Sequence, residues 1–270
     1  MDFTGIERRG LVLLGCGKMG SALLAGWLAG GLDPRAVWVI DPAPSDWLVT
    51  QGVRLNDGLP PDPAVTMVAV KPQMMGAALP QLAGMGGGGT LVISIAAGTT
   101  LAAFEAALGA GTPIVRAMPN TPAAVGRGVT ALVGNAVATP ADLDLAEGLM
   151  AAVGSTVRLQ QESQIDAVTA LSGGGPAYVF HLIEAMAAAG AAQGLPADLA
   201  LRLARETVCG AGELAHRSDE SAEQLRVNVT SPGGTTAAAL AHLMDPDTGL
   251  PPLMARAVAA AAARARALSD

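Results

Sequence analysis

Short apolar runs recur along the first half of the chain and alternate with longer segments of helical spacing. The runs do not alternate apolar with polar residues, which is typical of strands covered on both faces. They are LVLL (11–14), AVWVI (36–40), VTMVAV (65–70), TLVISI (90–95) and PIVRA (113–117). Intervening segments such as SALLAGWLAGG end in glycines that favour helix termination. This alternation predicts an α/β fold with a doubly wound parallel sheet, and GVTALVG (128–134) is a candidate further strand.

Beyond about residue 160 the strand pattern stops. Four windows rich in Ala and Leu predict an all-helical half, at 178–194, 197–217, 235–244 and 253–268. The first window is apolar on nearly every side between Tyr178 and Ala189, interrupted only by His181 and Glu184. A helix that is apolar all round needs burial all round, and about 110 residues can hardly supply it alone. We therefore expect a subunit interface in this half, and a homodimer.

The composition narrows the class of protein. With 51% hydrophobic and 14% charged residues among 270, the chain is not of the disordered type. Sixteen basic against 23 acidic residues give a net charge of −7, so there is no basic surface to neutralise a phosphate backbone. Aromatic residues are 3%, too few for base-stacking platforms. We therefore expect no nucleic-acid partner.

Cysteine and histidine form no chemical cluster in the sequence. Cys16 and Cys209 cannot build a disulfide framework and no spacing indicates a metal site, so we expect no metal and a reduced, cytoplasmic setting, with Cys209 in the core. The three histidines lie in separate helical windows. Residues 11–31 imitate a membrane span, but Lys18 and six glycines oppose that interpretation, so we expect no membrane partner.

The segment GCGKMG (15–20) matches the dinucleotide fingerprint G-x-G-x-x-G in its required place, after a strand and before a helix. Gly15 allows the tight turn, Gly17 lets the backbone approach a pyrophosphate, and Gly20 permits close packing of helix on strand. Asp41 follows the next strand, where an acid hydrogen-bonds a ribose hydroxyl and repels a 2′-phosphate. The alternatives are a glycine-rich turn without ligand, and a turn role for Asp41 before Pro42. The fingerprint makes the predicted sheet Rossmann-type.

Further candidate ligand groups follow later strands and precede helices. Lys71 comes directly after the run 65–70, and the small residues of SIAAG (94–98) leave room for a flat ring. The loops LSGGGPAY (171–178) and SPGGTT (231–236) offer successive backbone amides to an anion such as a carboxylate, with Ser231 as the helix cap of the second. The alternative to ligand binding is ordinary helix capping for the two loops, and a solvated position in a loop for Lys71.

Six motifs in order, GCGKMG, AVKP, SIAAG, RAMPNTPA, LSGGGPAY and SPGGTT, resemble those of the Δ1-pyrroline-5-carboxylate reductase family from residue 11 to beyond 240. The resemblance implies reduction of a cyclic imino acid to L-proline by NADPH or NADH, the last step of proline biosynthesis. It also implies a Rossmann domain followed by an all-α dimerisation domain that interlocks with its partner, often within a ring of dimers. We place these domains at 1–160 and 161–270.

The resemblance also implies roles for individual residues. Gly15, Gly17, Lys18 and Met19, with Gly20, would cradle the pyrophosphate, and Asn56 would reach the adenosine ribose. Val70, Lys71, Pro72, Ala96 and Ala97 would line the nicotinamide side. Ser231, Thr235 and Thr236 would bind the substrate carboxylate. Thr169 matches the family position whose hydroxyl faces the ring nitrogen, and is the candidate catalytic residue.

Two positions depart from the family pattern. Gly174 stands where the family usually has the second serine of SGSGPAY, which removes any contact from that hydroxyl. Asp41 stands where the family often has a small or polar residue, and an acid there favours NADH. Two other functions stay open: another Rossmann dehydrogenase or imine reductase acting on a small carboxylate, and a dinucleotide-sensing dimer without catalysis.

Overall fold

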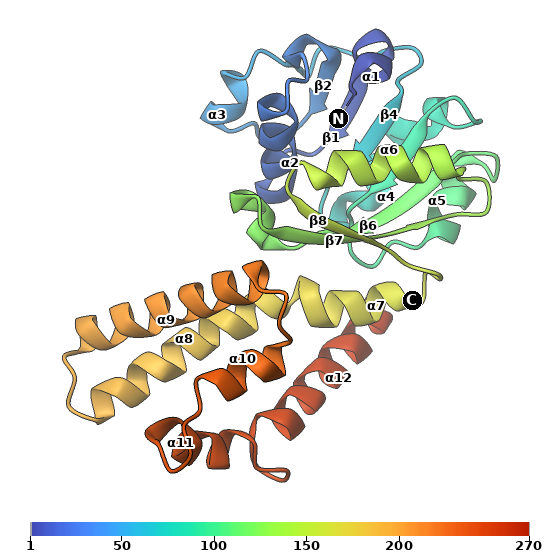
Figure 1. Ribbon diagram of the computed structural model, residues 1–270. Helices are drawn as coiled ribbons and strands as arrows, with labels where there is room; N and C mark the ends of the chain where they lie inside the picture. The colour runs from blue at the N-terminus through green and yellow to red at the C-terminus, as the bar shows by residue number, and fades with distance from the viewer. Residues whose placement is uncertain (1, 270) are drawn as a thin grey trace. The chain divides into compact units, whose positions relative to one another are not determined.

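The computed structural model describes residues 2–269, apart from the side chains of Pro72, Ala83 and Ser269. Contacts between residues divide the chain into two units. The first runs to Gly173 and includes the chain from Ala262 onwards, and the second is Gly174–Ala261. Figure 1 labels the helices and strands of both units along the chain.

The first unit contains one eight-stranded sheet, in the order β3-β2-β1-β4-β5-β6-β7-β8 over the described residues. Strands β1 to β6 run parallel, β7 is antiparallel to β6, and β8 is parallel to β7. The order 3-2-1-4-5-6 of the parallel strands is that of a dinucleotide-binding Rossmann sheet, which confirms the predicted fold class. The strands are β1 (Leu11–Leu14), β2 (Val37–Ile40), β3 (Arg54–Leu55), β4 (Val65–Val68), β5 (Leu91–Ser94), β6 (Ile114–Met118), β7 (Gly128–Gly134) and β8 (Gly154–Arg158).

The six apolar runs identified in the sequence all form strands, within two residues at each end. Strands β1, β4, β5 and β6 are buried throughout, as expected of strands covered on both faces. The two edge strands β3 and β8 were not predicted. Strand β3 has only two residues, and β8 is mostly exposed, so neither carries an apolar signal.

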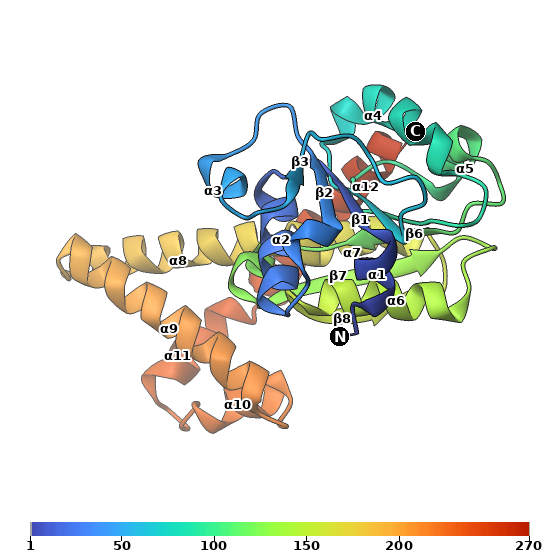
Figure 2. The same ribbon diagram turned by 90° about the horizontal axis from the view of Figure 1, so that it is seen from above.

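Helices cover both faces of the sheet. On one face α1 (Thr4–Arg9), α2 (Lys18–Ala29), α3 (Asp46–Val49) and α6 (Pro140–Ala151) share a buried cluster with the strands. On the other face α4 (Met75–Leu82) and α5 (Leu101–Leu108) pack through side chains such as Phe104, and Figure 2 shows the strands between α4 and α6. Trp27 of α2 is fully buried and its indole N–H donates to the carbonyl of Leu149 at 2.8 Å, which joins α2 to α6.

Short helical turns complete the first unit. Four 3₁₀ turns lie at Pro34–Ala36, Pro72–Met74, Ala83–Met85 and Thr121–Val125. After β8, the five-residue helix α7 (Gln164–Val168) passes into a π-helical turn, Thr169–Gly173. A π turn is rare in proteins and often marks a functional position.

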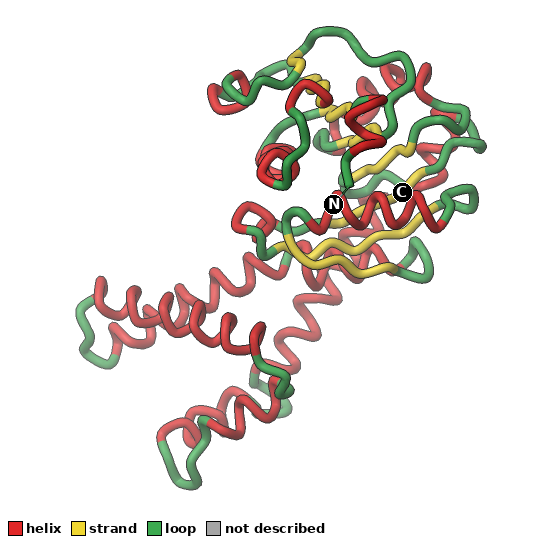
Figure 3. The backbone as a smooth tube through the Cα atoms, turned by 45° about the horizontal axis from the view of Figure 1, so that its top comes forward, coloured by secondary structure: helices red, strands yellow, loops and turns green. Residues whose placement is uncertain are grey.

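The second unit is helical throughout its described residues, which confirms the second predicted half, and Figure 3 shows strands in the first unit alone. Its helices are α8 (Gly175–Ala192), α9 (Ala197–Arg217), α10 (Ala222–Asn228), α11 (Thr235–Leu243) and α12 (Leu250–Ser269), the last ending in the first unit. Helix α10 was not predicted. No described helix is both long and apolar enough to cross a membrane.

The second unit has no core of its own. Helices α8, α10 and α11 contain no buried residue, and α9 buries only Ala200 and Ala204. Cys209, which we expected in the core, is exposed for the same reason. Phe180 of α8, a large apolar side chain, is 59% exposed. A single copy of the chain therefore leaves the apolar faces of this unit unburied.

Candidate functional site

Four parallel strands end at the same level of the sheet. Leu14, the last residue of β1, pairs in register with the last residues of β2 and β4, Ile40 and Val68, and Val68 pairs with Ser94 at the end of β5. The fingerprint, Asp41, residues 70–72 and residues 96–97 directly follow these ends. The structure therefore brings the predicted dinucleotide-binding residues to one edge, the carboxyl edge, where ligands bind in open α/β sheets.

The three fingerprint glycines meet the steric demands that predicted them. Gly15 has φ of +86°, and a Cβ there would lie 2.9 Å from the carbonyl oxygen of Ala69. A Cβ on Gly20 would lie 2.5 Å from the carbonyl oxygen of Gly15, so helix α2 packs closely on the loop. A Cβ on Gly17 would meet nothing within 4 Å. The open space at Gly17 lies where a pyrophosphate would approach the backbone, so the loop fits that group.

Helix α2 begins directly at this loop. Gly17 is its N-cap, without a capping side chain, and Lys18 and Met19 are its first residues. The first N–H groups of a helix have no intrahelical partner and favour an anion. Lys18 is exposed and Met19 is half-buried. The arrangement leaves backbone amides and one cation available to a diphosphate.

Cys16 lies inside the fingerprint loop but is 5% exposed. Burial raises the pKa of its thiol, and the hydroxyl of Ser21 lies 3.5 Å from the sulfur. The thiol therefore stays protonated at neutral pH and is a weak nucleophile. This supports a packing role for Cys16 in the turn.

Asp41 and Asn56 form one hydrogen-bonded unit at the ends of β2 and β3. The Asp41 carboxylate accepts from the backbone N–H of Cys16 at 2.7 Å and from that of Ala43 at 2.8 Å. Asn56, with φ of +52°, accepts from the N–H of Asp41 and donates to its carbonyl. Asp41 thus forms the turn considered in the sequence and also holds its carboxylate against the fingerprint loop. The side-chain carbonyl of Asn56 and one of its N–H groups are engaged with Asp41.

The residues expected beside the nicotinamide follow β4 and β5. Val70 is half-buried and Lys71 is exposed, and the side chain of Pro72 lies outside the described part of the structure. Ala96 is 4% exposed and Ala97 is half-buried. The side chains of Ala96 and Ala97 are small, and that they make room for a flat ring stays a prediction.

Thr169 begins the π turn, and its hydroxyl donates to the carbonyl of Ile165 at 2.8 Å. Ile165 is 1% exposed and forms a buried cluster with Met118 and Val133, on which Ala97 and Val168 also pack. The segment carrying Thr169 therefore packs beside Ala97, in the loop after β5. Because the hydroxyl proton is engaged, the oxygen of Thr169 has acceptor capacity left for a ligand.

The loop of residues 231–236 lies in the second unit. Helix α11 begins at Thr235 with Gly234 as its N-cap and no capping side chain, so the prediction that Ser231 caps the helix is wrong. The carbonyl of Ser231 instead accepts from the N–H of Gly234 at 3.0 Å, and Gly233 has φ of +68°. Because of this turn, α11 begins only at Thr235. The backbone N–H groups of Thr235 and Thr236 therefore lie in the first turn of the helix, where N–H groups have no intrahelical acceptor.

Two polar links, one from β6 and one from the loop after it, were not predicted. Arg116 forms an ion pair with Glu162 at 2.6 Å, and Asn120 donates to the carbonyl of Ser172 at 3.1 Å. Arg116 and Asn120 belong to the motif RAMPNTPA, which the sequence singled out. The motif did not predict their pairing with Glu162 and Ser172. Glu162 carries no sequence signal.

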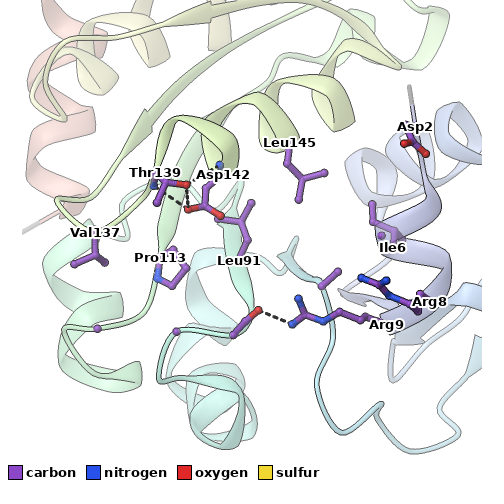
Figure 4. Close-up of a pocket in the computed structure, with 15 residues that line it drawn as sticks. Asp2, Ile6, Arg8, Arg9, Leu91, Pro113, Val137, Thr139, Asp142 and Leu145 are labelled. Carbon is purple, nitrogen blue, oxygen red and sulfur yellow. Dashed lines mark hydrogen bonds between the residues drawn. The ribbon is translucent and has the colours of Figure 1, made fainter.

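A hollow of about 340 Å³ lies at the opposite edge of the sheet. Its walls include Leu91 and Pro113, at the amino ends of β5 and β6, with Arg8 and Arg9 of α1 and Asp142 of α6 (Figure 4). Arg9 is engaged by Asp62 and by the carbonyl of Gly89. None of the motif residues lines this hollow, so it is distinct from the candidate site. Among the described residues no group of His, Cys, Asp and Glu is arranged to hold a metal ion.

The fold and the carboxyl edge of its sheet are those of a dinucleotide-binding protein of the Rossmann type with a helical second domain. The chain is 38% identical to pyrroline-5-carboxylate reductase of Pseudomonas aeruginosa over 266 residues, which cover 96% of this chain and 97% of that protein. It belongs to the pyrroline-5-carboxylate reductase family.

Other comparisons agree. Residues 162–268 match a family described as pyrroline-5-carboxylate reductase dimerisation, and residues 10–98 match one described as NADP oxidoreductase, coenzyme F420-dependent. Pyrroline-5-carboxylate reductase of Synechocystis is 42% identical over 243 residues, 86% of this chain and 89% of that protein. A solved pyrroline-5-carboxylate reductase from Coxiella burnetii superposes with a TM-score of 0.91 at 36% identity, covering 97% of this chain and 99% of that one. The Plasmodium falciparum enzyme, solved with NADP bound, has a TM-score of 0.82 at 29% identity, covering 98% and 99%.

Proposed function

We propose that this protein reduces Δ1-pyrroline-5-carboxylate to L-proline with NADH or NADPH, the last step of proline biosynthesis. When bound at the carboxyl edge, the reduced nicotinamide supplies a hydride to the imine carbon C5. Gly15, Gly17, Lys18, Met19 and Gly20 hold the pyrophosphate, and Val70, Lys71, Pro72, Ala96 and Ala97 border the ring. Family membership and the fit of the fingerprint loop to a diphosphate support these assignments.

The observation that carries the mechanism is the hydrogen bond from the Thr169 hydroxyl to Ile165. Since its proton is donated to that carbonyl, the Thr169 oxygen accepts rather than donates toward substrate. A ring nitrogen offers a proton to such an acceptor only in the iminium form, C=N–H⁺, which is also the better hydride acceptor. Thr169 therefore selects the reactive form and orients it, and hydride addition gives the N–H amine without proton transfer from the enzyme. The amine then takes a proton from water.

The carboxylate of the substrate binds at the start of α11. The free amides of Thr235 and Thr236, and the hydroxyls of these residues and Ser231, form a neutral anion site at a helix N-terminus. Holding the imine and the dinucleotide in fixed orientations can contribute about 7–11 kcal/mol to the barrier reduction. Lys18 and Lys71 are the only lysines, so the helical half has no lysine acid of the kind that hydroxy-acid dehydrogenases use.

Asp41 makes NADH the preferred donor. Its carboxylate is fixed against the fingerprint loop by Cys16, where it accepts hydrogen bonds from ribose hydroxyls and repels a 2′-phosphate. Asn56 supports this arrangement by holding the Asp41 backbone, and it has one N–H left for the ribose.

The protein acts as a homodimer, with a ring of dimers as a further assembly. The exposed apolar faces of α8 to α11 support pairing through the second unit, since a second copy would bury them. The net charge of −7 supports the absence of a nucleic-acid partner, and the two free cysteines agree with a cytoplasmic location.

The test is to mix the purified chain with NADH or NADPH and with Δ1-pyrroline-5-carboxylate, and to follow the absorbance of the reduced nicotinamide. We expect oxidation that depends on the imine and yields proline, which mass spectrometry detects. Gly15→Ala should abolish it, because the added Cβ clashes with Ala69. Gly58→Ala is the matched control, since Gly58 also has positive φ but nothing within 4 Å of its Cβ position. Binding of the dinucleotide without oxidation would indicate a sensor instead.

A further inference from the structure

The segment that carries Thr169 is short and is bonded to the sheet near both ends. Helix α7 has five residues, and the π turn after it has five more. Isolated helices of this length are unstable, so the direction of the Thr169 hydroxyl depends on what holds the segment. Its apolar contact is the small cluster of Ile165 with Met118 and Val133. Two polar links from β6 and the loop after it supplement that cluster.

The first link lies before α7. Arg116 of β6 has a side chain only 5% exposed, and its guanidinium pairs with Glu162 at 2.6 Å. The same carboxylate oxygen of Glu162 accepts from the backbone N–H of Leu101 at 2.7 Å, at the start of α5. Glu162 therefore joins the entrance of α7 both to β6 and to the helix that follows residues 96–98. A buried ion pair adds little net stability compared with apolar packing, so its value here is in fixing geometry.

The second link lies in the π turn. Asn120, 9% exposed, accepts from the N–H of Val129 at 2.9 Å and donates to the carbonyl of Ser172 at 3.1 Å. The Ser172 hydroxyl in turn donates to the carbonyl of Val168. The amide of Asn120 is thus held by β7 and fixes the turn three residues after Thr169.

We propose that Asn120 and Glu162 are positioning residues for the reduction: Asn120, in the loop after β6, and Glu162, through its ion pair with Arg116 of β6, hold the Thr169 segment near both ends and so aim the Thr169 oxygen at the ring nitrogen. This rests on the proposed function, in which Thr169 accepts from the iminium N–H. Neither residue contacts the substrate in this scheme. Each acts on the rate through Thr169.

The test compares two buried asparagines. Asn120→Asp keeps the acceptor for Val129 but replaces the donor to Ser172 with a second oxygen, which repels that carbonyl. Asn135→Asp is the control, because Asn135 is 8% exposed and likewise accepts from backbone N–H groups and donates to the Thr112 carbonyl at 3.0 Å, near the start of β6. Asn135 also donates to the Glu105 carboxylate at 2.9 Å, so its substitution perturbs its own surroundings at least as strongly as Asn120→Asp does. Both variants are made in the full chain, alone and combined with Thr169→Val.

If Asn120 acts through Thr169, N120D lowers kcat by at least about tenfold with KM for the dinucleotide nearly unchanged. In the T169V background the same substitution lowers kcat by less than about twofold, because the group it positions is already gone. N135D changes kcat by less than about twofold in either background. An equal effect of N120D in both backgrounds, or a loss from N135D as large as that from N120D, overturns the proposal.

Amide hydrogen exchange of residues 164–173, measured without cofactor, gives a second readout. N120D should speed exchange there by about tenfold relative to N135D, since a link closing the turn is lost. If the unaltered protein shows no imine-dependent oxidation, the proposed function fails. The exchange measurement still tests independently whether Asn120 holds residues 164–173. If N120D does not fold, Glu162→Gln tests the other link, with Glu147→Gln, which alters the exposed Glu147–Arg158 pair, as its control. Unchanged exchange in the folded variant contradicts the proposal.

Discussion

Removing the Asp41 charge should reverse much of the preference for NADH. The carboxylate is held by the N–H groups of Cys16 and Ala43, so it cannot swing away from an incoming 2′-phosphate. A 2′-phosphate carries about 1.5–2 negative charges at neutral pH. Asp41 is half-exposed, so the dielectric of water applies, and two unit charges about 4 Å apart repel by about 1 kcal/mol. The expected penalty on NADPH is about 2 kcal/mol, or about 30-fold in kcat/KM.

The assay measures kcat/KM for NADH and for NADPH at saturating imine, in the unaltered protein and in Asp41→Asn. Asparagine keeps one oxygen, which can accept from the N–H of Cys16 or from that of Ala43 but not from both, and it has no charge, so the NADH to NADPH ratio should fall by about 30-fold. Raising the ionic strength should reduce the difference in kcat/KM between NADH and NADPH in the unaltered protein, because salt screens the repulsion between Asp41 and the 2′-phosphate.

Asp33→Asn is the control for the change in total charge. Asp33 lies before β2, at the opposite end from Asp41, and its exposed pair with Arg35 does not involve the fingerprint. We expect it to leave the cofactor ratio unchanged. The electrostatic reasoning is refuted if the unaltered protein prefers NADPH, or if D41N and D33N have the same ratio.

Three further predictions concern substrate and assembly. Thr169→Val should lower kcat by at least about tenfold, since a hydrogen bond to a charged group contributes about 1.5–3 kcal/mol; an unchanged kcat/KM for the imine excludes the role. Thr236→Ala should raise KM for the imine by up to about tenfold and leave KM for the dinucleotide nearly unchanged, and equal effects on both contradict carboxylate binding. Phe180→Glu should place charges in the apolar face of α8, so sedimentation should show one chain where the unaltered protein shows two or more; an unaltered mass of one chain removes the dimer.

The sequence predicted the elements whose signal is local. Strands such as β4 and β5 are continuous apolar runs because both of their faces are covered. The edge strand β3 gives no such signal, since Arg54 is exposed and lies over the ring of Trp38 at 4.6 Å from its centre. Its pairing with β2 depends on contacts that appear only once the sheet is assembled.

The residues of the candidate site also fall into those that a local sequence pattern predicts and those that depend on tertiary contacts. The glycines of GCGKMG could be assigned from spacing, because each has a steric role within one turn of chain. The pairing of Arg116 with Glu162 spans 46 positions and depends on how β6 and α7 pack, so no spacing rule predicts it. The start of α11 was misplaced because a proline after serine is typical of a helix start, whereas here the glycines first form a turn.

The lack of a core in Gly174–Ala261 has a consequence for how a new chain matures. Residues up to Gly173 bury a complete sheet, so the sheet can fold before the end of α12, which belongs to the same unit, has been made. Helices α8 to α11 have little apolar surface to gain until another chain arrives. In the proposed dimer, the second unit is stabilised only when two chains associate. Its stability therefore falls as the protein is diluted, and at low concentration the second unit stays without a buried core.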